Sequence, residues 1–141
     1  MGQYHRIYNL TKKETFSPHK LGNGAKLLEW GCGGAYVAGM AVLLCNSNGR
    51  GGGDLNVHHD YNRGEDGKYI LTDKQRADSM AVERIAGRWA GDKIVVQGDY
   101  AEKGDAAFIS EQRLKGFKDI SDLVIEALSV DAYIKSEFLG K

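Results

Sequence analysis

The sequence predicts an α+β fold, with a small antiparallel sheet packed against a buried central helix and an amphipathic C-terminal helix. Three observations predict it. Short runs of β-forming residues lie between turn residues, residues 35–45 form an uncharged apolar run, and apolar residues recur at helical spacing over residues 120–128. At 141 residues, the chain is expected to form a single domain, residues 1–141, that buries a core of its own.

The N-terminal residues predict a β-hairpin. Residues 4–10 are rich in β-forming residues, and Tyr4, Arg6 and Tyr8 alternate with their neighbours as on a strand with one half-exposed face. A polar turn follows, and residues 15–16 are expected to return as a short second strand.

A buried helix is expected over residues 35–45, because this run has no charge and is rich in Ala, Met and Leu. Small residues around Gly39 allow a neighbouring element to approach closely. Asn48-Gly49 is expected to close the helix through a left-handed cap. Before the helix, residues 25–30 fit either a helical turn or a strand.

The middle of the chain, residues 56–78, is polar and is expected to form a peripheral insertion that carries a hairpin over residues 61–71. Thr72 and Gln75 fit a capping box that starts a short amphipathic helix. Residues 87–97 then predict two strands around a turn.

The C-terminal region predicts the clearest helix, over residues 120–128, with Asp119 as its N-cap. The residues beyond it are more apolar than a free tail requires. They are expected either to finish the core or to meet a second subunit in a homo-oligomer, and they are Tyr133, Ile134, Phe138 and Leu139.

Composition excludes some classes of function. The 19 basic residues balance 19 acidic ones, so no global field attracts a phosphate backbone and strong non-specific nucleic-acid binding is not expected, although a local basic face is compatible with this balance. Without an apolar leader or a membrane-length run, the expected location is the cytoplasm, with no membrane partner. Cys32 and Cys45 are expected to be buried free thiols.

Glycine precedes aspartate four times, and these pairs are the main functional signal. Glycine lets the backbone turn and a ligand approach closely, so each pair can present a carboxylate at a loop tip. The first pair ends a glycine-rich loop whose backbone N–H groups lie beside a guanidinium, as in phosphate sites, although the loop lacks a P-loop ending. Tight turns without a ligand are the competing interpretation. The candidate ligand-binding residues are Arg50, Gly51, Gly52, Gly53, Asp54, Arg88, Trp89, Asp92 and Asp99.

The same carboxylates are candidate ligands for a divalent metal ion, because Mg²⁺, Mn²⁺ and Ca²⁺ prefer oxygen ligands on loops. Asp92 and Asp99 flank one predicted strand, so a site that holds both needs that strand to bend or bulge. No EF-hand or zinc spacing is present, and turn-shaping aspartates with exposed histidines are the competing interpretation. The metal candidates are Asp54, Asp92, Asp99, His58 and His59.

Several stretches resemble a family of small, largely uncharacterised phage and bacterial proteins. The resemblance covers much of the chain except its middle and end, and it brings no activity. It implies a small accessory protein that binds a host component or a signalling nucleotide. The matching stretches include Met1-Gly-Gln-Tyr4, Pro18-His19-Lys20, Gly49-Arg-Gly-Gly-Gly-Asp54, Gly87-Arg-Trp-Ala-Gly-Asp92 and Gly98-Asp-Tyr100.

These observations favour a binding protein over an enzyme, because no nucleophile has a matched base. The expected partner is a small phosphate-bearing ligand or a protein. A metal-dependent phosphoesterase that uses Asp54, Asp92, Asp99 and the histidine pair is the first alternative. A structural or assembly protein of a virion is the second.

Overall fold

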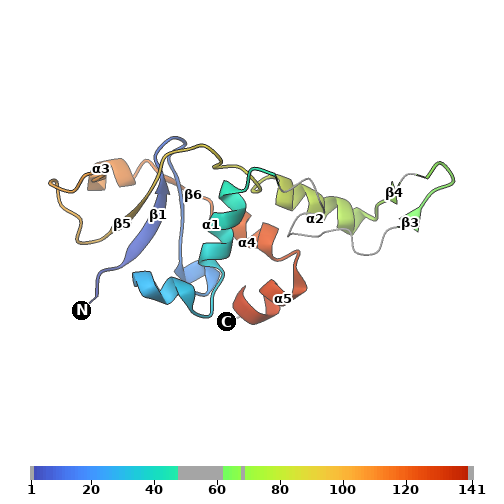
Figure 1. The fold of residues 1–141 in the computed structure, drawn as a ribbon, viewed down its shortest axis with the longest axis horizontal. Helices are drawn as coiled ribbons and strands as arrows, with labels where there is room; N and C mark the ends of the chain where they lie inside the picture. The colour runs from blue at the N-terminus through green and yellow to red at the C-terminus, as the bar shows by residue number, and fades with distance from the viewer. Residues whose placement is uncertain (1, 48–61, 68, 140–141) are drawn as a thin grey trace.

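The computed structural model describes residues 2–47, 62–67 and 69–139. It contains a small four-stranded mixed sheet together with several helices, which confirms the predicted α+β class (Figure 1). Three short helical turns are present, η1 (His19–Leu21), η2 (Leu27–Gly31) and η3 (Lys135–Leu139). The strands are β1 (His5–Asn9), β2 (Glu14–Phe16), β3 (Asn62–Arg63), β4 (Tyr69–Ile70), β5 (Ile94–Gly98) and β6 (Lys118–Asp119), and the helices are α1 (Tyr36–Leu44), α2 (Asp73–Glu83), α3 (Glu111–Leu114), α4 (Ser121–Leu128) and α5 (Ala132–Ile134).

The main sheet has the strand order β5-β1-β2-β6. β1 pairs antiparallel with β2 and β5, which confirms the predicted N-terminal hairpin. The prediction of a wholly antiparallel sheet is wrong, because β6 pairs parallel with β2. A parallel pair needs a long crossover connection, and the chain that carries α1, α2 and β5 supplies it.

A tyrosine hydroxyl joins β1 and β2. Ile7 and Phe16 are register partners, yet the Ile7 N–H donates to the Tyr36 hydroxyl at 2.9 Å, and this hydroxyl donates to the Phe16 carbonyl at 2.6 Å. All three residues are fully buried. Burial raises the pKa of Tyr36 well above its usual value, so the hydroxyl stays protonated and can donate this bond.

The core lies on one face of the sheet, beneath α1 and α4. α1 confirms the predicted helix, but only one of its faces is buried: Gly39 lies where α1 meets its neighbours, whereas Val37 and Ala41 are exposed. A Cβ atom on Gly39 would lie 2.8 Å from Val124 Cγ1 on α4 and 3.2 Å from Phe16 Cε2 on β2. This glycine is therefore required for close packing, as the small residues of the sequence predict.

We expect Gly39→Val to lower the free energy of unfolding by about 2 kcal/mol, because a side chain there overpacks the contact between α1 and α4. Urea denaturation followed by circular dichroism measures the change. Ala41→Val is the matched control, since Ala41 is exposed on the same helix and should lose only about 0.5 kcal/mol of helix propensity. Equal losses in both variants would contradict the packing argument.

Residues 87–97 do not form the predicted pair of strands. Only β5 is present, and Arg88 and Trp89 lie in consecutive turns. The backbone N–H of Gly87 donates to the Val42 carbonyl, and that of Trp89 donates to the Leu43 carbonyl. These bonds supply donors to the carbonyls near the C-terminal end of α1. The hydrogen bonds gained in this way outweigh the preference of the residues of this segment for a strand.

Several predicted boundaries also move. α1 ends at Leu44 with Cys45 as an extended C-cap, which is earlier than the predicted left-handed cap at Asn48-Gly49, a pair outside the described residues. Residues 25–30 give the 3-10 turn η2 rather than a strand. The N-cap of α4 is Ile120, although Asp119 Oδ1 does accept the Ser121 N–H bond.

Both cysteines are free, but neither belongs to the buried class that the sequence predicts. Cys32 is exposed because it follows η2 in a glycine-rich bend, and Cys45 is half-buried. At the C-terminus, Ile134, Phe138 and Leu139 pack against the core, whereas Tyr133 is 66% exposed. Ile134, Phe138 and Leu139 thus finish the core, the first of the two expected outcomes, and Tyr133 does not.

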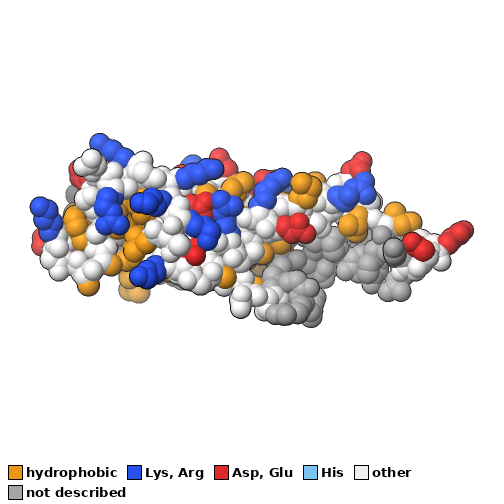
Figure 2. Space-filling model, turned by 90° about the horizontal axis from the view of Figure 1, so that it is seen from above, with side chains coloured by type: hydrophobic (Ala, Val, Ile, Leu, Met, Phe, Trp, Pro, Cys, Tyr) orange, Lys and Arg blue, Asp and Glu red, His pale blue; other side chains and the backbone are white. Residues whose placement is uncertain are grey.

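The β3–β4 hairpin and α2 extend away from the sheet (Figure 1). The hairpin is confirmed as antiparallel, and both bonds of the Thr72–Gln75 capping box are present at the start of α2. No helix in the described part of the chain combines the length and apolar character that a membrane crossing needs. The space-filling view shows Lys and Arg side chains gathered over the sheet half of one face (Figure 2).

Candidate functional site

The described residues contain only part of the predicted ligand set. The glycine-rich loop and the histidine pair lie outside the described residues, and these are Arg50, Gly51, Gly52, Gly53, Asp54, His58 and His59. The structure therefore places four of the candidates, namely Arg88, Trp89, Asp92 and Asp99.

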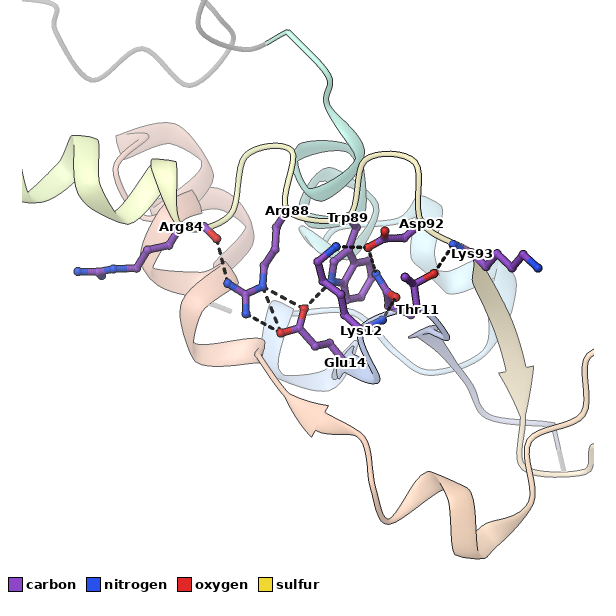
Figure 3. Close-up of polar contacts among 9 residues, drawn as sticks. Thr11, Lys12, Glu14, Arg84, Arg88, Trp89, Asp92 and Lys93 are labelled. Atoms are coloured by element: carbon purple, nitrogen blue, oxygen red, sulfur yellow. Dashed lines mark hydrogen bonds and ion pairs between the residues drawn. The ribbon is translucent and has the colours of Figure 1, made fainter.

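Arg88 and Trp89 converge on one carboxylate, that of Glu14 (Figure 3). The Arg88 guanidinium donates from Nε and Nη2, with Nη2 2.5 Å from Glu14 Oε2, and Trp89 Nε1 donates to Oε1 at 2.9 Å. Glu14 is 5% exposed and Trp89 is fully buried. The hydrogen bonds from Arg88 lower the pKa of Glu14, and the bond from Trp89 lowers it further. Together they outweigh burial, which by itself would raise this pKa.

Asp92 forms a second internal contact beside this cluster (Figure 3). Its Oδ2 accepts from Lys12 Nζ at 2.5 Å and from Asn9 Nδ2 at 2.8 Å. The hydrogen bond from Lys12, followed by that from Asn9, lowers the pKa of Asp92. Arg88, Trp89 and Asp92 thus hold the turn after α2 against the β1–β2 hairpin, and each has its polar groups engaged inside the protein.

Asp99 lies at the opposite end of β5. Its Oδ1 accepts from the Tyr4 N–H at 2.9 Å, and its own N–H donates to the Tyr4 carbonyl. β5 pairs residue by residue with β1 from Ile94 to Gly98, without a bulge. Asp92 and Asp99 therefore belong to different ends of the sheet, as expected for a straight strand. Among the described residues, no three His, Cys, Asp or Glu side chains form a group that could hold a metal ion.

A cleft of about 260 Å³ lies at the Asp99 end. Tyr4, Arg6 and Tyr8 of the β1 region line it together with Gln97 and Asp99 of the β5 region. Alternation along β1 places Arg6 and Tyr8 on the sheet face opposite Ile7, so the cleft belongs to the outer face rather than to the core. Its remaining walls are His5, Ser17, Pro18, His19, Ala25, Gly98 and Leu114.

Arg6 is the chemically distinctive residue of this cleft. It is half-buried, and it makes no ion pair or side-chain hydrogen bond with any residue that the structure describes. A partly desolvated guanidinium is normally paired, because desolvation costs free energy that a partner must offset. Burial raises the pKa of the neighbouring Tyr8 and Arg6 partly opposes this rise, so the two side chains act on each other electrostatically.

Acidic groups near Arg6 are already engaged. Burial alone would raise the pKa of Asp119, but hydrogen bonds from Ser121 and the nearby cations Lys20 and Arg6 lower it below its usual value. Asp119 Oδ2 lies 3.6 Å from Lys20 Nζ, and its other oxygen binds Ser121. Arg6 thus keeps donors that an anion in the cleft can use.

His5 adds an unsatisfied acceptor or donor at this end of β1. Its Nδ1 atom is buried and has no hydrogen-bond partner in the described structure. His5 lines the cleft and also a neighbouring hollow of about 210 Å³ that it shares with Gly98. A buried polar atom without a partner costs about 1–3 kcal/mol.

Sequence reasoning missed Arg6, Tyr8 and His19 as site residues. One signal was available: Tyr4, Arg6 and Tyr8 alternate along a strand whose face was expected to be half-exposed. Three segments far apart in the sequence also meet in this cleft, since Tyr4, Pro18-His19 and Gly98-Asp99 all line it.

Comparisons with known proteins do not add a function to this geometry. No protein-family model matches the chain, and neither a curated protein nor a solved structure matches it.

Proposed function

We propose that the chain is a small accessory protein that binds a small phosphate-bearing ligand in the cleft around Arg6. One observation carries this proposal: Arg6 is half-buried and forms no ion pair with any described residue. Guanidinium groups bind phosphate through two parallel hydrogen bonds, and such charge-assisted bonds are about twice as strong as neutral ones.

The other lining residues fit the same ligand class. The hydroxyls of Tyr4 and Tyr8 can donate to phosphate oxygens, and His19 can add a donor or a positive charge. Tyr4 is 51% exposed, which leaves a ring face free for contact with a sugar or a base. At about 260 Å³ the cleft lies just below the range of about 300–1,000 Å³ typical for drug-sized ligands, so a compact phosphomonoester fits better than a dinucleotide.

The resemblance to phage and bacterial proteins supports the accessory role, because its motifs contribute lining residues from three separate parts of the chain. In this proposal Asp99 positions the start of β1 through its bond to the Tyr4 N–H. The glycine-rich loop at Arg50 to Asp54 remains a second candidate element for ligand contact.

Isothermal titration calorimetry with ribose 5-phosphate, adenosine 5′-monophosphate and inorganic phosphate tests the proposal. We expect at least one phosphate compound to bind, unphosphorylated ribose or adenosine to bind at least tenfold more weakly, and Arg6→Gln to weaken binding by about tenfold or more. Amide NMR shifts should change first at residues 4–8 and 97–99.

The matched control is Arg76→Gln, because Arg76 is an exposed arginine on α2, far along the chain from the cleft, and its substitution changes the net charge equally. This variant should bind like the wild type. A wild-type protein that binds none of the three compounds, or an Arg6→Gln variant of wild-type affinity and unchanged melting temperature, would contradict the proposal.

A further inference from the structure

The surface around the β1–β2 turn carries lysines that form no ion pair with any described residue. Lys13 lies in the turn, Lys93 precedes β5 and Lys118 begins β6. Backbone bonds place them on either side of the β1–β2 hairpin: the Lys118 N–H donates to the Lys13 carbonyl on the β6 side, and the Leu10 N–H donates to the Lys93 carbonyl on the β5 side. We call the surface formed by Lys13, Lys93 and Lys118 the basic turn surface.

Two acidic residues next to this surface already form ion pairs with other cations of the protein. Glu14 is covered by Arg88, and Asp92, whose side chain is 11% exposed, is covered by Lys12. The three lysines are exposed and form no ion pair with any described residue. Figure 3 shows the Lys93 side chain pointing away from the Glu14 and Asp92 contacts, and Figure 2 shows Lys and Arg gathered over the sheet half. A locally positive surface therefore exists on a chain with no net charge.

The backbone at Lys13 adds a second observation. Lys13 is the only described residue other than glycine with a positive φ, 56°. Lysine has no special tolerance for this left-handed conformation, whereas glycine, asparagine or aspartate would adopt it more easily. Lysine here keeps a charge at the tip of the turn at a cost in conformational energy, and such strain is often found at functional positions.

The chemistry of the surface distinguishes between two anionic partners. Protein interfaces usually have an apolar core, but none of the large exposed apolar side chains of the described structure lies in the turn, in residues 88–93 or in residues 115–119. Lysines without apolar anchors suit the regularly spaced charges of a phosphate backbone. We propose that the basic turn surface binds the phosphate backbone of double-stranded nucleic acid without reading its sequence.

Fluorescence anisotropy with a labelled 20-base-pair DNA of arbitrary sequence tests this proposal over a range of salt concentrations. With about three phosphate contacts, the logarithm of the binding constant should fall with the logarithm of salt concentration with a slope of about −3. The triple variant Lys13→Gln, Lys93→Gln and Lys118→Gln should bind about tenfold or more weakly at low salt and should lose most of this slope.

The matched control is the triple variant Lys74→Gln, Lys103→Gln and Lys135→Gln, which changes the net charge equally at exposed lysines of other elements. It should keep wild-type affinity and slope. Lys13→Gly supplies a variant that should fold at least as well as the wild type, because glycine relieves the positive φ, and yet should bind DNA more weakly.

Three results would overturn the proposal: no DNA binding by the wild type at low salt, equal losses in the two triple variants, or a Lys13→Gly variant with wild-type affinity and slope. Binding of polyglutamate in place of DNA would also overturn it, and would assign the surface to an acidic protein.

Discussion

Glu14→Ala is expected to lower the free energy of unfolding by about 3 kcal/mol, because it leaves the partly buried Arg88 guanidinium and the buried Trp89 N–H without their acceptor. Chemical denaturation measures the loss. Glu126→Ala is the matched control, since its pair with Arg84 has both side chains about half exposed and should contribute only about 0–1 kcal/mol. Similar losses in the two variants would show that burial does not set the strength of the Glu14 contact.

The Glu14 contact also predicts a dependence on pH. Its folded pKa is lowered, so its stabilisation is fully present above the unfolded glutamate pKa of about 4.3 and is lost as pH falls through the lower folded pKa. Glu14→Gln removes this contribution. The variant should therefore lose less stability than the wild type between about pH 5 and pH 3, while the lowered pKa values of Asp92 and Asp119 still act in both. Parallel stability curves would contradict the assignment.

Tyr36→Phe is the second substitution with a large expected effect. It removes one hydroxyl and leaves the buried N–H of Ile7 and the buried carbonyl of Phe16 without this partner, which should cost about 2–4 kcal/mol. The melting temperature should fall by roughly 10 °C. Differential scanning calorimetry measures both quantities.

Tyr133→Phe is the control for Tyr36→Phe, because Tyr133 is 66% exposed and its hydroxyl can bond to water. It should change the melting temperature by roughly 1 °C or less. A stable Tyr36→Phe variant would mean that β1 and β2 close directly when the hydroxyl is removed.

Sequence patterns correctly predicted the elements that form through interactions between residues close together in the chain. The hairpin of β1 and β2, the apolar helix α1 and the Thr72–Gln75 capping box depend on neighbouring residues, and all three are confirmed. The parallel pairing of β6 with β2 joins distant parts of the chain, and no local pattern encodes it. The segment around Trp89 has strand-like residues, but Gly87 at φ 74° and Gly91 at φ 80° turn the backbone there.

The candidate site was less predictable than the fold. The motif that contains Arg88, Trp89 and Asp92 resembles a ligand loop, and only the structure shows that Glu14, Asn9 and Lys12 occupy its polar groups. The cleft around Arg6 takes its lining from segments far apart in sequence. A sequence cannot reveal which of many surface arginines lacks a partner, because that depends on every neighbouring element.

The two backbone bonds from Gly87 and Trp89 to the end of α1 have a consequence for chain length. They close the intervening segment, with its β3–β4 hairpin, into a loop whose ends are fixed by the core. The turn of the β3–β4 hairpin, at residues 64–67, lies inside this closed segment and away from the core, and closure entropy grows only with the logarithm of loop length. An insertion in that turn should therefore cost the core little, whereas one in residues 87–89 would displace the two bonds that close the segment.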